Sequence, residues 1–328
     1  VSDNLRLRSR RLNAGLTLVA DAEAGRYGGA IDGKLGDYRL ESVGLFDVAS
    51  GARVQVDTSA GVNLAGSVRA RSTRISNAGV QSLTGGETVI STDLAYQRNG
   101  VTRLSNMRLS SPLLSVKEGG GTYGANGAFD ITAKGQSVDY GPLALQLTGT
   151  VANPVAVIDA PSPGVGLGLA DVTATVRGED QLYRIEADGM SDFGTFSANA
   201  LADFSSGPSR YEITSGELGG VALSGTVTQT PEGLFAGALD AQGRGLSGRV
   251  QLAVEDGLQI ARITASARNM TLPGAAGLRV GRGQAEARAV LRDEPEITAT
   301  LQLAGARYFD TRIDKARVEL DLVGGQGS

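Results

Sequence analysis

The side chains that could do chemistry in this chain are carboxylates, hydroxyls, amines and guanidinium groups, because the sequence contains no histidine and no cysteine. Without histidine there is no Ser-His-Asp triad and no histidine general base. Without cysteine there is no thiolate nucleophile, disulfide, iron–sulfur cluster or cysteine zinc site. Catalysis by Asp, Glu, Lys, Ser or Tyr alone stays open, but we expect no enzyme, no cofactor and no metal site.

Pairs of carboxylates two residues apart are the first candidates for chemistry. Glu186 and Asp188, like Glu319 and Asp321, would share one face of a strand, as a catalytic or metal-binding pair can. The same face also carries arginine and threonine. We therefore interpret these pairs as parts of a solvated outer face.

A glycine-rich stretch and an arginine cluster are the other candidates. Gly164, Gly166 and Gly168 lack the strand–loop–helix context of a nucleotide site, and we expect a plain loop there. The cluster of Arg6, Arg8, Arg10 and Arg11 could contact anionic headgroups or a partner, or could be the polar edge of a strand. Both interpretations stay open.

Strict alternation of apolar and polar residues is the dominant pattern of the chain, and it predicts strands with one apolar and one polar face. The clearest runs are residues 129–134, 172–177, 183–188, 250–255, 263–268, 285–289, 297–303 and 316–322. No stretch has a helical stripe of twelve or more residues. The region 272–283 reads as a loop.

Turn dipeptides separate these runs. Asn99-Gly100, Asn126-Gly127, Asp256-Gly257, Asp32-Gly33 and Asp188-Gly189 all favour the positive φ of tight hairpins. Strand-plus-turn units at this spacing predict roughly 25 strands.

We expect a single repetitive segment over residues 1–328, of all-β class, folded as an elongated and curled antiparallel sheet with few or no helices. Gly119-Gly120-Gly121 and Pro161-Ser162-Pro163-Gly164 are the linker-like points, and we interpret both as loops within one sheet. The net charge of −4 and the scattered basic residues argue against a nucleic-acid partner.

The apolar face carries many small side chains. With 47 glycines and only 8 tyrosines and 7 phenylalanines, a closed sandwich would be hard to fill to native packing density. The composition instead favours closely stacked sheets or an apolar face curved around something that is not protein. The residues that we expect to line such a groove are Leu145, Leu147, Val172, Val176, Ile185, Val250, Leu252, Ile297, Leu301, Leu303, Val318 and Leu320.

Two stretches, residues 25–48 (GRYGGAIDGKLGDYRLESVGLFDV) and 145–176 (LQLTGTVANPVAVIDAPSPGVGLGLADVTATV), resemble the repeat region of the TamB family. This family of AsmA-like proteins is the inner-membrane component of the translocation and assembly module of Gram-negative bacteria.

The resemblance implies a β-taco, a long curled sheet with an apolar inner groove in the periplasm. It implies phospholipid acyl chains as cargo, a role in phospholipid transport to the outer membrane and in outer-membrane protein assembly, and a TamA-like barrel as partner. The chain would be a middle segment, with its inner-membrane anchor and its contact to the barrel in parts outside it.

Two other classes of protein compete with this interpretation. An extracellular β-solenoid adhesin or passenger domain would have a closed, side-chain-filled core and a regular repeat. A hydrolase on a β-helix would need an acidic cluster on one exposed face. Neither signature stands out in the sequence.

Overall fold

The computed structural model describes the whole chain except residues 1, 22–25, 41–42, 58–60, 77, 97–98, 139, 164–168, 180–181, 192–193, 206–207, 231–233, 272–277, 292–295, 309–310, 324–325 and 328. The chain divides into two compact units, and we describe each separately. Unit 1 comprises Val1–Val165 with Thr173–Gln181, and unit 2 comprises Gly166–Val172 with Leu182–Ser328. The expectation of one repetitive segment over residues 1–328 stays a prediction.

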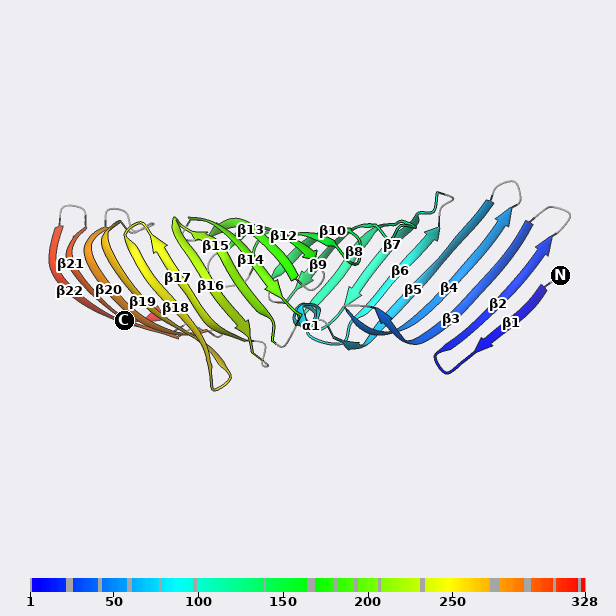
Figure 1. Cartoon of the computed structure of the whole chain (residues 1–328), viewed down its shortest axis with the longest axis horizontal. Coiled ribbons are helices and arrows are strands. Elements are labelled where there is room, and N and C mark those ends of the chain that lie inside the picture. Colours follow the sequence, from blue (N-terminus) through cyan, green and yellow to red (C-terminus); the bar gives the residue numbers. More distant parts are fainter. Residues whose placement is uncertain are drawn as a thin grey trace. The chain divides into compact units, whose positions relative to one another are not determined.

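Unit 1 is an antiparallel sheet in which consecutive strands pair (Figure 1). Its strands are β1 (Ser2–Arg8), β2 (Leu12–Asp21), β3 (Arg26–Leu40), β4 (Gly44–Asp57), β5 (Gly61–Ile75), β6 (Val89–Tyr96), β7 (Thr102–Ser110), β8 (Leu114–Tyr123), β9 (Phe129–Ser137), β10 (Gly141–Gly149), β11 (Pro154–Ala160) and most of β12 (Ala170–Glu179).

A short helix, α1 (Ala78–Thr84), lies between β5 and β6. It ends at Gly85, whose φ of 70° and N–H bond to the carbonyl of Gln81 are typical of a glycine after a helix. The amide of Leu113, before β8, donates to the carbonyl of Thr84 at 3.1 Å. The helix has 7 residues, in line with the expected absence of long helical stripes.

Unit 2 is also an antiparallel sheet of consecutive strands. Its strands are β13 (Leu182–Ser191), β14 (Gly194–Asp203), β15 (Arg210–Leu218), β16 (Val221–Gln229), β17 (Phe235–Gly243), β18 (Leu246–Glu255), β19 (Leu258–Thr271), β20 (Leu278–Leu291), β21 (Glu296–Tyr308), β22 (Thr311–Val323) and β23 (Gln326–Gly327).

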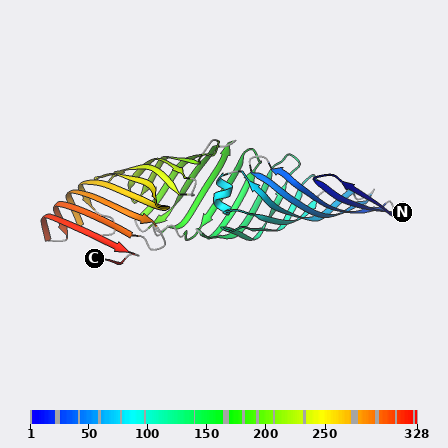
Figure 2. The ribbon, with the colours of Figure 1, turned by 90° about the horizontal axis from the view of Figure 1, so that it is seen from below.

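The expected all-β class and curled antiparallel sheet are confirmed. Figure 2 shows the strands of each unit curving along their length. Within the described residues, the first and last strands of neither unit pair with each other, so neither sheet closes into a barrel. Ile260 and Val280 are the largest fully buried side chains among the described residues, so the buried core is thin.

Tight turns of two left-handed residues connect several strands. Asp256 and Gly257 have φ of 50° and 75° between β18 and β19, as the sequence predicts. Arg244 and Gly245, with φ of 51° and 81°, connect β17 to β18. Two consecutive positive φ angles match the right-handed twist of the flanking strands, which explains these hairpins.

Two other turn predictions were wrong, because the strand continues through the dipeptide in each case. Asp32-Gly33 lies inside β3, and Asp188-Gly189 lies inside β13. A Cβ on Gly189 would come within 2.7 Å of the Phe196 ring on the neighbouring strand.

Two loop predictions were also wrong. Gly119-Gly120-Gly121 lies inside β8, where a Cβ on Gly121 would come within 2.0 Å of the Asp130 carbonyl oxygen on β9. Residues 278–283 of the expected 272–283 loop belong to β20, and 272–277 lie outside the described residues.

Of the expected Pro161–Gly164 loop, residues 161–163 lie between β11 and β12. Gly164, Gly166 and Gly168 lie outside the described residues.

The strands β19 to β22 turn a corner near one end. On β19 the residues between buried Ala267 and half-buried Met270 are both exposed, and on β22 the same holds between Ile313 and Ala316. Inward positions are thus three residues apart here, as they also are between Ile213 and Gly216 on β15, and two apart in the neighbouring stretches of β19 and β22. The flanking rows stay in register across all four strands.

We call the row Asn269, Gly281, Gly305 and Asp314 the corner. Asn269 and Gly305 have φ of 50° and 65°, which lets β19 and β21 bend without losing their pairing. Beyond the corner, Met270, Val280, Ala306 and Ile313 form one further apolar row. Val280 is 1% exposed and Ala306 is 0% exposed, so this row closes the end of the apolar surface against solvent.

Candidate functional site

One face of unit 2 is apolar across every strand from β13 to β22. Residues directly opposite each other in an antiparallel sheet lie on the same face, so the register defines rows that cross the strands. The central row is Ile185, Ala200, Ile213, Gly225, Leu239, Val250, Ile263, Ala287, Ala299 and Leu320. It holds aliphatic residues and glycine alone.

Three neighbouring rows continue this face. They start on β13 at Tyr183, Ala187 and Gly189 and end on β22 at Leu322, Val318 and Ala316 respectively. Among the residues that the structure describes in these rows, none is charged or an amide. We call the four rows together the apolar face of unit 2.

The apolar face is less exposed than the opposite one. Along β13, Tyr183, Ile185 and Ala187 are half-buried, whereas Arg184, Glu186 and Asp188 are exposed. Small side chains contribute to this face, with alanine or glycine at four of the ten positions in the central row. The expected solvated positions of Glu186, Asp188, Glu319 and Asp321 are confirmed.

Unit 1 has an equivalent face. One row runs Leu5, Leu16, Ile31, Ala52, Gly66, Leu94, Leu104, Gly121, Ile131, Leu147 and Ala156. On β1, Leu5 and Leu7 are each 53% exposed, because β1 has a neighbour on one side only among the described strands. Arg6 and Arg8 alternate with them and are exposed on the opposite face, which leaves both interpretations of the arginine cluster open.

The structure places ten of the twelve expected lining residues on these apolar faces. Leu147 lies in the unit 1 row, and Leu145 lies in the adjacent row opposite Ala133 and Ile158. In unit 2 the assignments are Ile185, Val250 and Leu320 to the central row, Leu252 and Ile297 to the Tyr183 row, Leu301 and Val318 to the Ala187 row, and Leu303 to the Gly189 row. Val172 and Val176 are half-buried and four residues apart on β12, hence on one face of that strand. That these residues line a lipid site stays a prediction.

Sequence reasoning missed an aromatic ladder at one end of the unit 2 face. Tyr183, Phe204, Tyr211 and Phe235 stack edge to face, with ring centroids 5.2, 5.9 and 5.8 Å apart. Such pairs add attraction beyond the area that they bury. Tyr183, Tyr211 and Phe235 recur on every second strand, β13, β15 and β17. This recurrence can be recognised once the order and register of the strands are known.

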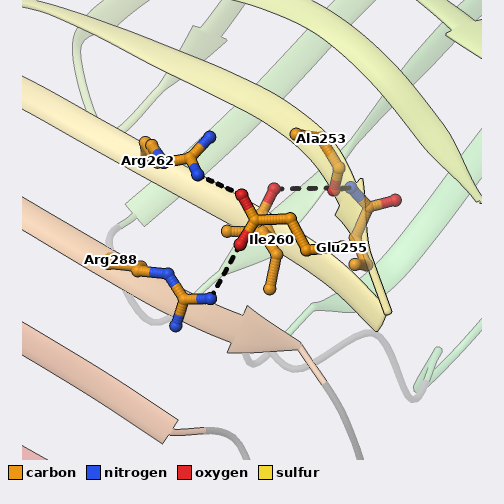
Figure 3. Close-up of polar contacts among 6 residues, drawn as sticks. Ala253, Glu255, Ile260, Arg262 and Arg288 are labelled. Carbon is orange, nitrogen blue, oxygen red and sulfur yellow. Dashed lines mark hydrogen bonds and ion pairs between the residues drawn. The ribbon is translucent and has the colours of Figure 1, made fainter. Parts of the chain in front are cut away.

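An ion-pair network covers part of the opposite face. Glu255, at the end of β18, accepts hydrogen bonds from Arg262 on β19 and from Arg288 on β20, the latter at 2.9 Å (Figure 3). Ile260 lies beside this network and is 1% exposed although it belongs to the polar face. The hydrogen bond from Arg288, followed by the charge of Arg262, lowers the pKa of the Glu255 carboxyl below its usual range.

The hollows of the polar faces hold charged residues of both signs. In unit 1 one is lined by Asp32, Lys34, Arg69, Asp93 and Asn106, and the Asn106 amide donates to Asp93 at 2.7 Å. Over the described part of the chain, no three His, Cys, Asp or Glu side chains gather as metal ligands would. No described helix is long and apolar enough to cross a membrane.

No protein-family model matches the chain, and no curated protein or solved structure matches it significantly. The two faces of each sheet are therefore the features from which we infer function. What this arrangement offers is an apolar strip with small side chains, backed by a charged surface that keeps the outside in water.

Proposed function

We propose that this chain is a non-enzymatic carrier surface of the periplasm whose apolar faces hold the acyl chains of phospholipids. In this proposal it resembles the TamB family in serving phospholipid transport to the outer membrane, outer-membrane protein assembly, or both. A TamA-like barrel is the proposed partner and the inner membrane the proposed anchoring site, each through parts of a longer protein.

The observation that carries the proposal is the continuity of the apolar rows. Each methylene group in water is unfavourable by ~0.8 kcal/mol, so a 16-carbon chain in water is unfavourable by on the order of 13 kcal/mol. A charged or amide group anywhere in the central row of unit 2 would interrupt a path for such a chain. The register puts none there.

The adhesin alternative finds less support in the same observations. A solenoid adhesin needs a closed core filled by large side chains. Among the described residues, the largest fully buried side chains are those of Ile260 and Val280, and most apolar positions are half-buried.

A photo-crosslinking residue distinguishes the two faces without adding a charge. We would place it at Leu147 or Leu301 on the apolar faces and, as matched controls, at the exposed neighbours Gln146 or Gln302. The chain would be expressed in the periplasm of a Gram-negative host, irradiated and analysed by intact mass. We expect phospholipid adducts from the leucine positions and none from the glutamine positions; equal labelling of both faces would contradict the proposal.

A charge on the apolar face should block binding. We expect Leu301→Asp to weaken binding of an acyl-labelled phospholipid by at least about tenfold, since a carboxylate and an acyl chain cannot share an apolar strip. Gln302→Asp, on the exposed face of the same strand, should leave binding unchanged. Circular dichroism of both variants distinguishes loss of binding from loss of the fold. A folded Leu301→Asp variant that binds the lipid with wild-type affinity would contradict the proposal.

A further inference from the structure

The end of the β19–β22 sheet carries a concentration of cations on its polar face. Arg268, Arg282 and Lys315 lie in the row before the corner, and Arg279, Arg307 and Arg312 lie in the polar row beyond it, one residue from the strand ends. We call these six residues the cationic band. All six side chains are exposed.

Like charges face each other directly in this band. Arg268 is opposite Arg282, and Arg279 is opposite Arg307, which in turn is opposite Arg312. Opposed residues in a sheet have Cβ atoms about 5 Å apart, and like charges there are destabilising. Stability of the sheet alone therefore does not explain the arrangement.

Among the described residues, acidic side chains are fewer in and beside the band than elsewhere on the same face. The described residues of the two cationic rows include no acidic side chain, and Asp314, in the corner row between them, pairs with Arg312 at 3.0 Å. Farther along the same strands, Arg262 and Arg288 share Glu255, and Arg317 pairs with Glu319 at 2.9 Å. The band therefore has a net positive charge while the rest of this face holds both signs.

The band lies beside the end of the apolar face. Between the two cationic rows lies the apolar row of Met270, Val280, Ala306 and Ile313. The side chains of this row point to the apolar face, opposite to those of the band. β20 begins at Leu278, one residue before Arg279, and β22 begins at Thr311, one residue before Arg312. A long arginine side chain can lay its methylene stem along apolar surface while its guanidinium group stays in water.

We propose that the cationic band binds the headgroup phosphate of an anionic phospholipid whose acyl chains lie on the apolar face of unit 2. This inference rests on the proposed function and adds the class of headgroup. Guanidinium groups bind phosphate oxygens in pairs, and an anion among opposed arginines relieves their repulsion. An amphiphile can bind both surfaces at once, because its charged headgroup and its apolar tails belong to one molecule.

The test compares two lipids with identical acyl chains and headgroups of different net charge. Binding of phosphatidylglycerol and of phosphatidylcholine with identical labelled acyl chains would be titrated on the purified chain at low and at high salt. We expect tighter binding of phosphatidylglycerol at low salt and a difference that shrinks as salt screens the charges.

The variant to use is Arg279→Gln with Arg282→Gln. Each basic residue near an anionic lipid contributes about fivefold in affinity. We therefore expect the double variant to lose at least about tenfold for phosphatidylglycerol and nothing for phosphatidylcholine. Its thermal midpoint should equal or exceed that of the wild type, because each substitution removes a like-charge pair.

The matched control is Arg184→Gln with Arg249→Gln, two exposed cations of the same face of unit 2 outside the band. An equal loss in this control, or equal affinity of the wild type for both lipids, would overturn the inference and leave the proposed function standing. Failure of both lipids to bind would overturn the two together. Glycerophosphoglycerol has the same headgroup but no acyl chains. If it bound as tightly as the whole lipid, the band would be a site for phosphate alone, and the inference would be overturned.

Discussion

At the scale of single residues, Glu255 is the carboxylate with the most developed surroundings. Two guanidinium groups from two different strands bond its two oxygens, and the contact joins β18, β19 and β20. The cluster also lies beside Ile260, an apolar side chain on the polar face. We infer that its role is to cover this side chain, which explains why an isoleucine is tolerated there.

The lowered pKa of Glu255 makes a prediction about pH. A carboxylate whose folded pKa lies below its unfolded value stabilises the fold above the unfolded value, about 4.3, and loses that stabilisation as pH falls through the folded pKa. We expect Glu255→Gln to lower the midpoint of thermal unfolding at neutral pH. The difference from the wild type should vanish in strong acid, at about pH 2.

Scanning calorimetry across this pH range checks the prediction. Glu186→Gln, an exposed carboxylate of the same unit, serves as the comparison. A Glu255→Gln effect that is the same at neutral and strongly acidic pH would mean that the ion pairs are not its source.

At the scale of elements, glycine positions set how closely neighbouring strands approach. Gly121 on β8 lies in the apolar row of unit 1, and a Cβ there would come within 2.0 Å of the Asp130 carbonyl oxygen on β9. Gly66 on β5 is similar, at 2.3 Å from the carbonyl oxygen of Gly51. These contacts permit the sheet to bend, in the way that glycine kinks curve designed sheets.

This geometry predicts a large difference between two alanine substitutions. We expect Gly121→Ala to destabilise the fold by about 1–3 kcal/mol, the usual range for overpacking. Gly15→Ala in the same unit should be neutral or slightly stabilising, since a Cβ at Gly15 meets nothing within 4 Å. Urea unfolding of both variants measures this, and equal stabilities would show that β8 and β9 can shift apart freely.

The alternation of apolar and polar residues predicted most strands and their faces, because successive side chains of a strand point to opposite faces of the sheet. Every expected lining residue of unit 2, from Ile185 to Leu320, follows from that rule and from the register. The turn predictions at Asp32-Gly33 and Asp188-Gly189 were wrong because local preference for a turn yields to packing of the neighbouring strand.

Features that depend on several strands at once could not be predicted from one strand's pattern. The corner needs Asn269, Gly281, Gly305 and Asp314 in one row, although they are far apart in sequence. The stacking of Tyr183 against Phe204 and of Tyr211 against Phe235 depends on register in the same way. The loop expected at residues 272–283 was wrong for residues 278–283, because Gly281 and Gly283 lie within β20, in the corner row and beside it.

At the scale of the whole molecule, the central claim is that each unit presents a continuous apolar face for acyl chains and a charged face for water. The direct measurement is native mass spectrometry, with lipid extraction, of the chain purified from the periplasm of a Gram-negative host. The account predicts one or more co-purifying phospholipid molecules per chain, enriched in anionic headgroups. A well-folded, lipid-free monomer would contradict it.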